Sequence, residues 1–189
     1  MRKITSQEIA EIGIIAAISF LLSYLPLDFF NKGLDLSVGL VPLAIFSVRR
    51  GVRASFSASI VWGLLALIFR GLPGAVSPIQ VILDYPVAFA MAGFFGLYSR
   101  VIRSQLNKGI TPKLSLKVIQ LAFIGVFPRW FFHFLAGWFF WGSYLPKGTS
   151  PVMNSLVLNG TSFIANFVMV SILLVIIIHI APNLFRAPR

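Results

Sequence analysis

The chain has 189 residues, of which 58% are hydrophobic and only 11% are charged, and its mean hydropathy is +0.90. A soluble domain carries about 25% charged residues, so this composition excludes a soluble globular protein. The net charge of +11 comes from short basic clusters between apolar runs, which argues against the continuous basic face of a nucleic-acid-binding protein. The chain has no cysteine, which excludes disulfides and cysteine-ligated metal sites.

The apolar runs predict an all-α integral membrane protein, with six transmembrane helices in a single domain over residues 1–189. A spanning helix needs about 20 mostly apolar residues. In chain order the predicted spans are Ile9–Leu27, Leu36–Val48, Ala54–Phe69, Pro78–Tyr98, Leu116–Trp141 and Val152–Ile180. The second span is short and contains Pro42, so we expect it to be tilted, kinked or partly inserted. Glu8 and Glu11 interrupt the start of the first span, which indicates a retained helix and not a signal peptide.

The basic residues are divided unequally between the two ends of these helices. One side of the membrane holds Arg2, Lys3, Arg49, Arg50, Arg53, Arg100, Arg103, Lys108, Lys113, Lys117, Arg186 and Arg189. The other side holds Lys32, Arg70 and Lys147. Because lysine and arginine collect in cytoplasmic loops, we expect both termini and the loop Ser104–Lys117 in the cytoplasm. The loop Asp28–Asp35 should then lie outside, where it is a candidate lid.

Asp84 is the one acidic residue inside a predicted span, about 9 Å below the outer boundary at 1.5 Å per residue. A carboxylate at such a depth is costly and usually marks a functional site. His133 and Asn159 fall at a similar depth on two other helices, so we expect these three side chains to converge on one pocket. The alternative is that Asp84 pairs with Arg129 of the fifth span and only locks two helices together.

Aromatic residues surround this level of the predicted bundle. They are Tyr85, Trp130, Trp138, Trp141 and Tyr144. Trp and Tyr also gather at membrane interfaces, a role that we expect for Trp141 and Tyr144 at least in part. An aromatic wall beside a carboxylate suits a flat cationic ligand through stacking and cation–π attraction. The chain has no phosphate-binding loop, zinc-protease motif or nucleophile elbow, so we expect no catalytic residue, no metal and no cofactor.

Gly13 and Ala17 lie four residues apart in the first span, with Ala16 beside them. Small residues at this spacing let a second helix approach closely. Such spacing is common in membrane helices, so the pattern fits either a partner-docking face or ordinary packing inside the subunit.

Four stretches of the sequence are more specific. They read GLVPLAIFSVRRG (Gly39–Gly51), VWGLL (Val61–Leu65), QVILDYPVAF (Gln80–Phe89) and HFLAGWFFWGSYLPKG (His133–Gly148). Together they resemble the thiamine-specific S component of energy-coupling factor (ECF) vitamin transporters, and the likeness covers nearly the whole chain. The resemblance implies six helices with both termini inside, and a high-affinity subunit that captures thiamine from outside. It also implies docking on a transmembrane T component with two ATPases, and toppling to release the vitamin inside.

The resemblance also implies binding positions. The acidic residue before Tyr-Pro is Asp84 and is followed by Tyr85, and the further matches are His133, Trp141 before Gly-Ser-Tyr, and Asn159 before glycine. We add Trp138, Tyr144 and Asn154 to the expected substrate-binding set. The family docks through small residues of its first helix, which map to Gly13, Ala16 and Ala17.

The chain departs from the family pattern at four positions. Asp84 replaces a glutamate, Gly33 or Leu34 replaces a tryptophan, and Gly74 and Asn154 replace tyrosines. These losses leave open a relative of thiamine, such as its pyrimidine precursor or a phosphorylated form, as the ligand.

We therefore expect a thiamine-binding S component in the prokaryotic plasma membrane. Its partners would be the T component, two ATPase subunits and membrane lipid, with no nucleic acid. A membrane-embedded enzyme with Asp84 and His133 as acid and base is a weaker alternative, because no nucleophile or metal constellation accompanies them. A stand-alone carrier is a third hypothesis, and it would require inverted repeats or broken helices.

The charge distribution predicts that a cysteine at Asn107 is shielded in intact cells from a membrane-impermeant maleimide, because Arg100–Lys117 lies in the cytoplasm. A cysteine at Lys147 should be labelled under the same conditions. The chain contains no native cysteine, so each variant carries a single reporter. Labelling at Asn107 in sealed cells would contradict the topology.

Overall fold

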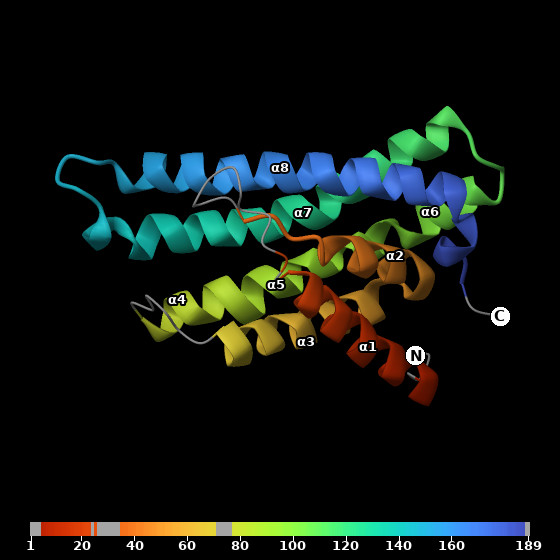
Figure 1. The fold of residues 1–189 in the computed structure, drawn as a ribbon, viewed down its shortest axis with the longest axis horizontal. Helices are drawn as coiled ribbons and strands as arrows, with labels where there is room; N and C mark the ends of the chain where they lie inside the picture. The colour runs from red at the N-terminus through yellow and green to blue at the C-terminus, as the bar shows by residue number, and fades with distance from the viewer. Residues whose placement is uncertain (1–4, 24, 26–34, 71–76, 188–189) are drawn as a thin grey trace.

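The computed structural model describes residues 5–23, 25, 35–70 and 77–187, and within these ranges it contains helices and no β-strand (Figure 1). Six helical rods follow one another along the described chain. They are α1 (Ser6–Leu22), α2 (Leu40–Arg50), α3 (Val52–Arg70), a composite rod from Pro78 to Leu106, α7 (Pro112–Phe140) and α8 (Pro151–Ile180). The predicted all-α fold with six helices is confirmed. Of these rods, α3, the composite rod, α7 and α8 are long and apolar enough to cross a membrane.

Capping residues set several helix starts a few residues earlier than the apolar pattern predicted. The backbone N–H of Glu8 donates to Thr5 Oγ1 at 3.2 Å, so α1 begins at Ser6 and not at Ile9. Thr111 caps α7 in the same way and Pro112 occupies the first helical position, where its missing N–H is harmless. At its other end α1 stops at Leu22, before the predicted end at Leu27, which lies outside the described residues.

The composite rod is built from five segments, of which three are α-helical, one is π-helical and one is 3₁₀-helical. They are α4 (Pro78–Ile82), the π-helical η2 (Leu83–Val87), α5 (Ala88–Met91), the 3₁₀-helical η3 (Ala92–Tyr98) and α6 (Ser99–Leu106). Pro86 has no N–H to donate, and the helix widens to a π-turn around it. The helix continues beyond Tyr98, the predicted end of the membrane span, to Leu106, because no glycine or proline interrupts α6. The loop that we predicted from Ser104 to Lys117 is accordingly shorter, since α7 already begins at Pro112.

Helix α2 is short, with 11 residues, and it is largely buried. Pro42 is its third residue, where the backbone N–H would have no intrahelical partner, so the proline does not break the helix. Gly39 caps α2 and lies against the backbone of Ser19 in α1, where a Cβ atom would clash with the Ser19 carbonyl group. The absence of a side chain at Gly39 therefore permits the close approach of α1 and α2.

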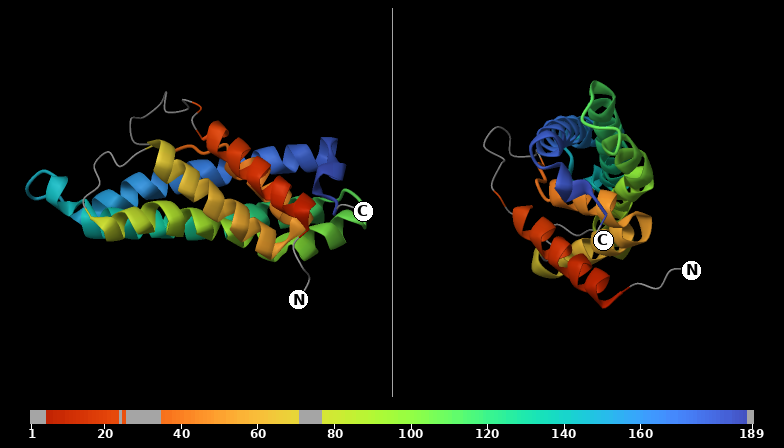
Figure 2. Two further views of the ribbon diagram at one scale, coloured as in Figure 1. Left: turned by 90° about the horizontal axis from the view of Figure 1, so that it is seen from below. Right: turned by 90° about the vertical axis from the view of Figure 1, so that its right-hand side faces the viewer.

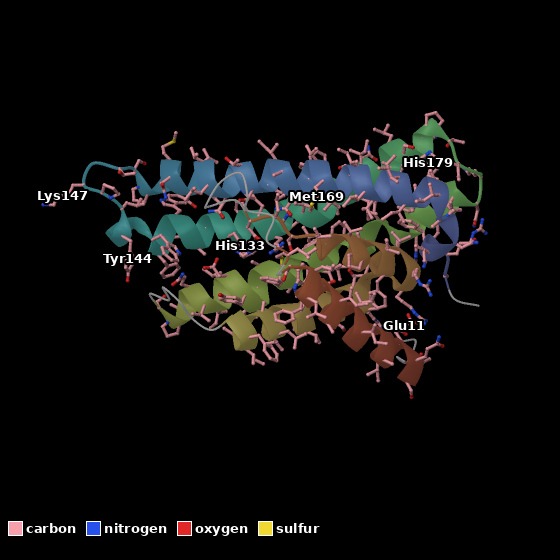
Figure 3. All side chains as sticks on the ribbon, in the orientation of Figure 1. Glu11, His133, Tyr144, Lys147, Met169 and His179 are labelled. Carbon is pink, nitrogen blue, oxygen red and sulfur yellow. The ribbon has the colours of Figure 1, made fainter. Side chains whose placement is uncertain are left out.

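The long helices α7 and α8 run side by side along the bundle, while α1 lies on its outside (Figures 1 and 2). Lys147 and Tyr144 lie at the end of the bundle opposite to Glu11 and His179, with His133 between (Figure 3). Charged contacts tie the Glu11 end together. Arg50 Nε donates to Glu11 Oε2 at 2.7 Å, and Arg103 Nη1 donates to the carbonyl oxygen of Arg49 at 2.9 Å.

Candidate functional site

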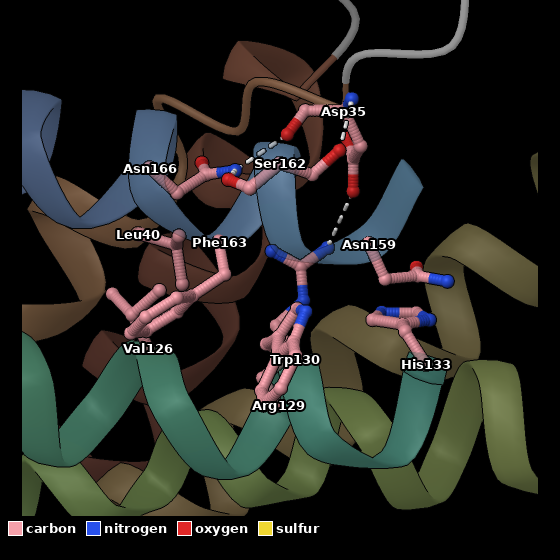
Figure 4. Close-up of a pocket in the computed structure, with 10 residues that line it drawn as sticks. All are labelled: Asp35, Leu40, Val126, Arg129, Trp130, His133, Asn159, Ser162, Phe163 and Asn166. Atoms are coloured by element: carbon pink, nitrogen blue, oxygen red, sulfur yellow. Dashed lines mark hydrogen bonds and ion pairs between the residues drawn. The ribbon is translucent and has the colours of Figure 1, made fainter. Parts of the chain in front are cut away.

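A cavity of about 180 Å³ lies between α7, α8 and the segment that leads into α2 (Figure 4). It mixes charged, amide, hydroxyl and aromatic side chains. The lining residues are Asp35, Leu40, Val126, Arg129, Trp130, His133, Asn159, Ser162, Phe163 and Asn166. The cavity thus combines an apolar wall with a few convergent polar groups, which is typical of small-molecule sites.

A stripe of polar residues on α8 forms one side of the site. Ser155, Asn159, Ser162 and Asn166 recur at intervals of four, three and four residues and therefore share one helix face. Ser155 Oγ donates to the carbonyl oxygen of Phe134 at 2.7 Å and so joins α8 to α7. Asn159 Nδ2 donates to both the carbonyl oxygen and Oγ of Ser155 at 3.1 Å. These bonds use only Nδ2, so Oδ1 of Asn159 remains available as an acceptor.

Ser162 and Asn166, in the C-terminal part of the same stripe, bind the segment that precedes α2. The backbone N–H of Asp35 donates to Ser162 Oγ at 3.1 Å, and the N–H of Ser37 donates to Asn166 Oδ1 at 2.8 Å. Asn166 Nδ2 in turn donates to the carbonyl oxygen of Asp35. Asn166 is only 5% exposed and Ser37 is buried, so the bond between them satisfies a backbone N–H that water does not reach.

The carboxylate of Asp35 reaches across the cavity to α7. Its Oδ2 lies 3.3 Å from Arg129 Nη2, and the dashed line in Figure 4 marks this ion pair. The Arg129 side chain is 6% exposed and that of Asp35 is 48% exposed, so a buried cation has a half-exposed counter-ion. We expected Asp84 or a helix carbonyl as the partner of Arg129, and the ion pair that the structure shows is with Asp35.

Two aromatic rings also contact the Arg129 guanidinium. The guanidinium carbon lies 4.5 Å from the centre of the Phe89 ring and 5.3 Å from that of Trp62. Cation–π contacts of this kind are strongest where the cation is removed from water. They fix the guanidinium between the composite rod, α3 and the cavity.

Asp84 pairs with His133, which lies on α7 one turn beyond Arg129. Asp84 Oδ1 is 3.1 Å from His133 Nδ1, and Gln80 Nε2 donates to Asp84 Oδ2 at 3.3 Å. A carboxylate oxygen can only accept here, so Nδ1 carries the proton and Nε2 is the free ring nitrogen. His133 and Asn159 both line the cavity, whereas Asp84 is outside its described lining and reaches the site through its bond to His133.

His133 Nε2 and Trp130 Nε1 are buried nitrogen atoms in the lining of this cavity, and neither has a hydrogen-bond partner among the described residues. A buried polar atom without a partner is destabilising by about 1–3 kcal/mol. A ligand that supplies complementary groups removes this penalty, so both atoms mark places where a ligand would be recognised.

The aromatic wall of the cavity comes from α7 and α8. Trp130 and Phe163 face the cavity, and their ring centres are 5.3 Å apart. Trp130 also stacks on Phe134 at 5.7 Å. Offset and tilted ring pairs at such distances form a firm apolar surface. A flat ligand can therefore lie against this surface while its polar atoms meet His133 and Asn159.

The other aromatic residues that we expected at the site lie around it. Tyr85 is on the π-helical segment and stacks on Phe89, with ring centres 6.4 Å apart. Trp138 is 39% exposed and stacks on Phe139 at 4.7 Å. Trp141 follows the end of α7 and packs against Tyr144 at 5.8 Å, and Tyr144 is 63% exposed. None of these four residues is in the described lining of the cavity.

Asn154 belongs to the first turn of α8, at a partly buried position that is also outside the described lining. Gly33, Leu34 and Gly74, where the family pattern has aromatic residues, lie outside the described residues. Most of the candidate lid Asp28–Asp35 does so too, and its last residue is the Asp35 that pairs with Arg129.

The first helix separates its three small residues between two environments. Ala16 is fully buried in the core, so our expectation that it faces a partner was wrong. Gly13 is exposed, and a Cβ atom built on it would meet nothing within 4 Å. Ala17 is partly exposed. The period of 3.6 residues per turn explains this division, because Ala16 points about a quarter of a turn away from Ala17.

Asp35, Ser162 and Asn166 line the cavity but were not among the residues predicted for the site. Asp35 looked like a loop residue, and nothing in the local pattern shows that its carboxylate reaches α7. For Ser162 and Asn166 a signal was present, since they extend the polar face that begins at Ser155 and Asn159 within an otherwise apolar helix.

Comparison with known proteins places this geometry in a family. The family model described as thiamine transporter protein (Thia_YuaJ) matches residues 9–186. The chain belongs to this family. It is 37% identical to the thiamine transporter ThiT of Lacticaseibacillus paracasei over 181 residues, which cover 95% of this chain and 90% of that protein. It is also 31% identical to the thiamine transporter ThiT of Bacillus subtilis over 181 residues, covering 95% and 94% of the two chains.

The solved structure of ThiT from Listeria monocytogenes has the same fold, with a TM-score of 0.87 at 31% sequence identity. The match covers 95% of this chain and 97% of that one. The resemblance that the four sequence stretches indicated is thus confirmed for the family and for the whole fold, and the family is one of membrane transporters.

The hydrogen bonds of Asn166 to the backbone of Asp35 and Ser37, which we call the clasp, lead to a first test of this site. Asn166→Ala removes the partners of the Asp35 carbonyl and the Ser37 N–H, which should lower stability by about 1–3 kcal/mol. The midpoint of thermal unfolding of the purified protein in detergent should fall by several degrees. Ser171→Ala on the same helix is the control, because the buried Ser171 hydroxyl has no hydrogen-bond partner in the described part of the chain. Equal effects of the two substitutions would contradict the clasp.

Proposed function

We propose that this protein binds thiamine with high affinity at the outer face of the cell membrane, as the S component of an ECF-type importer. The observation that carries the proposal is the Asp84–His133 pair, which opens onto a cavity with an aromatic wall. Support comes from the membership of a thiamine transporter family along almost the whole chain.

The chemistry of thiamine matches the groups around the cavity. Its thiazolium ring carries a permanent positive charge, and its aminopyrimidine ring is flat and carries hydrogen-bonding nitrogens. In a site with little water these groups must be met by the protein. We assign the hydrogen bonds of the aminopyrimidine to Asp84, His133 and Asn159, and the stacking of the flat rings to Trp130 and Phe163.

Membership of the family also argues against one hypothesis that the sequence left open. Its members are transporters, so the acid–base enzyme with Asp84 and His133 is set aside. The Asp84–His133 pair then serves to orient the imidazole ring. A phosphorylated or truncated relative of thiamine stays a secondary ligand hypothesis.

Delivery of the vitamin requires partners that hydrolyse ATP, since the sequence has no phosphate-binding loop of its own. We assign this role to a T component with two ATPase subunits. Both described chain ends lie at the Glu11 end of the bundle (Figures 1 and 3). With the basic loops on the same side, this arrangement supports a multi-pass protein with both termini in the cytoplasm.

The first prediction of this proposal concerns Asp84. Truncation of one partner of a buried charge-assisted bond costs about 2–5 kcal/mol, which is roughly 30- to 4,000-fold in affinity. Asp84→Asn should therefore weaken thiamine binding by at least tens of fold in isothermal titration of the purified protein. His133→Ala should weaken it less, because it removes a neutral hydrogen-bonding group and not a charge.

Glu11→Gln is the matched control, because Glu11 pairs with Arg50 far from the cavity. It should bind thiamine with wild-type affinity. Normal binding by Asp84→Asn would contradict the assigned site. A variant that does not fold would instead show that Asp84 is needed for helix packing.

The second prediction concerns docking on the partner module. Gly13 is exposed, and a Cβ atom built on it would have open space around it. Gly13→Trp should abolish thiamine uptake by cells and leave binding by the isolated subunit intact, because close helix approach needs small side chains. Ala17→Trp should act in the same direction.

Ile164→Trp provides the control, since Ile164 is 61% exposed and belongs to α8 and not to α1. This variant should support normal uptake. Uptake at the wild-type rate by Gly13→Trp would show that this face of α1 is not the docking surface.

A further inference from the structure

The cavity holds an arginine, which is unexpected beside a site for a cationic ligand. Arg129 is 5% exposed and lines the cavity together with His133 and Asn159. Two like charges a few ångströms apart in a partly dry site repel each other strongly, because the effective dielectric constant is far below that of water. An unpaired Arg129 would therefore oppose the binding of any cation here.

Asp35 offsets this charge within the same lining. Its carboxylate lies 3.3 Å from the guanidinium, and it is held there by its own backbone. The Asp35 N–H donates to Ser162, and the Asp35 carbonyl accepts from Asn166. The position of the carboxylate thus depends on two hydrogen bonds to α8 that do not involve the charge.

The balance of charge follows from a count of the described ionisable groups around the cavity. Asp35 and Arg129 line the cavity with one carboxylate and one guanidinium, and Asp84 adds a second carboxylate directly behind the lining residue His133. With Asp35 present the carboxylates outnumber the cation, so the site favours a monocation. Without Asp35 the charges of Asp84 and Arg129 cancel and this preference is lost.

We propose that Asp35 is a specificity-determining residue that neutralises Arg129 and so lets the cavity prefer a cationic ring over a neutral ring of the same shape. This inference rests on the proposed function, since thiamine supplies the cationic ring. It assigns to Asp35 an electrostatic role toward the ligand in addition to its backbone role in the clasp.

The test compares two probes of nearly equal shape, thiamine and an analogue in which a neutral thiophene ring replaces the thiazolium ring. Asp35→Asn keeps the backbone bonds to Ser162 and Asn166 and removes only the charge. Affinity for thiamine should fall by about tenfold or more, a moderate value because the carboxylate is half exposed and partly screened. Affinity for the neutral analogue should change by less than about threefold, so the ratio of the two affinities should fall. Both affinities are measured by titration of the purified protein.

The double variant Asp35→Asn with Arg129→Gln completes the test. It leaves Asp84 as the only charge of the three, so the ratio of thiamine to analogue affinity should return toward the wild-type value. An equal loss for both probes in Asp35→Asn, or an unchanged ratio, would overturn the inference and leave Asp35 as a structural anchor. A ratio that stays low in the double variant would overturn it as well. Wild-type protein that binds neither probe would instead contradict the proposed function itself.

Discussion

In this fold the guanidinium of Arg129 is buried, and a buried guanidinium in a membrane protein has to be paired and held in place. Asp35 supplies the counter-charge, while Phe89 and Trp62 supply ring faces. These contacts come from the segment before α2, from the composite rod and from α3, and Arg129 itself belongs to α7. The segment before α2 is in turn bound to α8 through Asn166. One cation therefore connects five parts of the bundle at the level of the cavity, and the geometry of the lining depends on it.

The helical architecture could be predicted from the sequence because each span is a long apolar run, and because membrane interiors accept only structures that satisfy their own backbone. The errors were at the ends of helices, where local capping decides. Thr5 and Thr111 begin helices several residues before the apolar run starts. The extension of α6 beyond Tyr98 was missed because its residues are polar and basic, although nothing in them breaks a helix. Apolar content marks the part of a helix that lies in lipid, whereas hydrogen bonds determine where the helix begins and ends.

The site could be predicted only in part, because spacing along a helix predicts how deep a residue lies in the membrane but not which residues it contacts. A constant rise per residue places Asp84, His133 and Asn159 at one level, and the structure brings these three together. Trp138 and Trp141 lie five and eight residues beyond His133, which is about 8 and 12 Å further along the axis of α7, and neither lines the cavity. The approach of Asp35 to Arg129 joins residues 94 positions apart in the chain. Such a contact depends on tertiary structure, and no local pattern contains it.

The polar residues of α7 and α8 fall into two groups with different tasks. Ser162 and Asn166 use their groups on the chain itself and hold the segment before α2. His133 is oriented by Asp84 through Nδ1, and its Nε2 has no hydrogen-bond partner among the described residues. The internal bonds of Asn159 use only its Nδ2. A buried polar atom without a partner is unfavourable in the empty protein, and in the lining of a cavity it marks a place where a ligand would be recognised. Under the proposed function, the groups that the fold leaves unsatisfied meet the hydrogen-bonding nitrogens of a flat molecule, and the excess of carboxylates over guanidinium matches its positive charge.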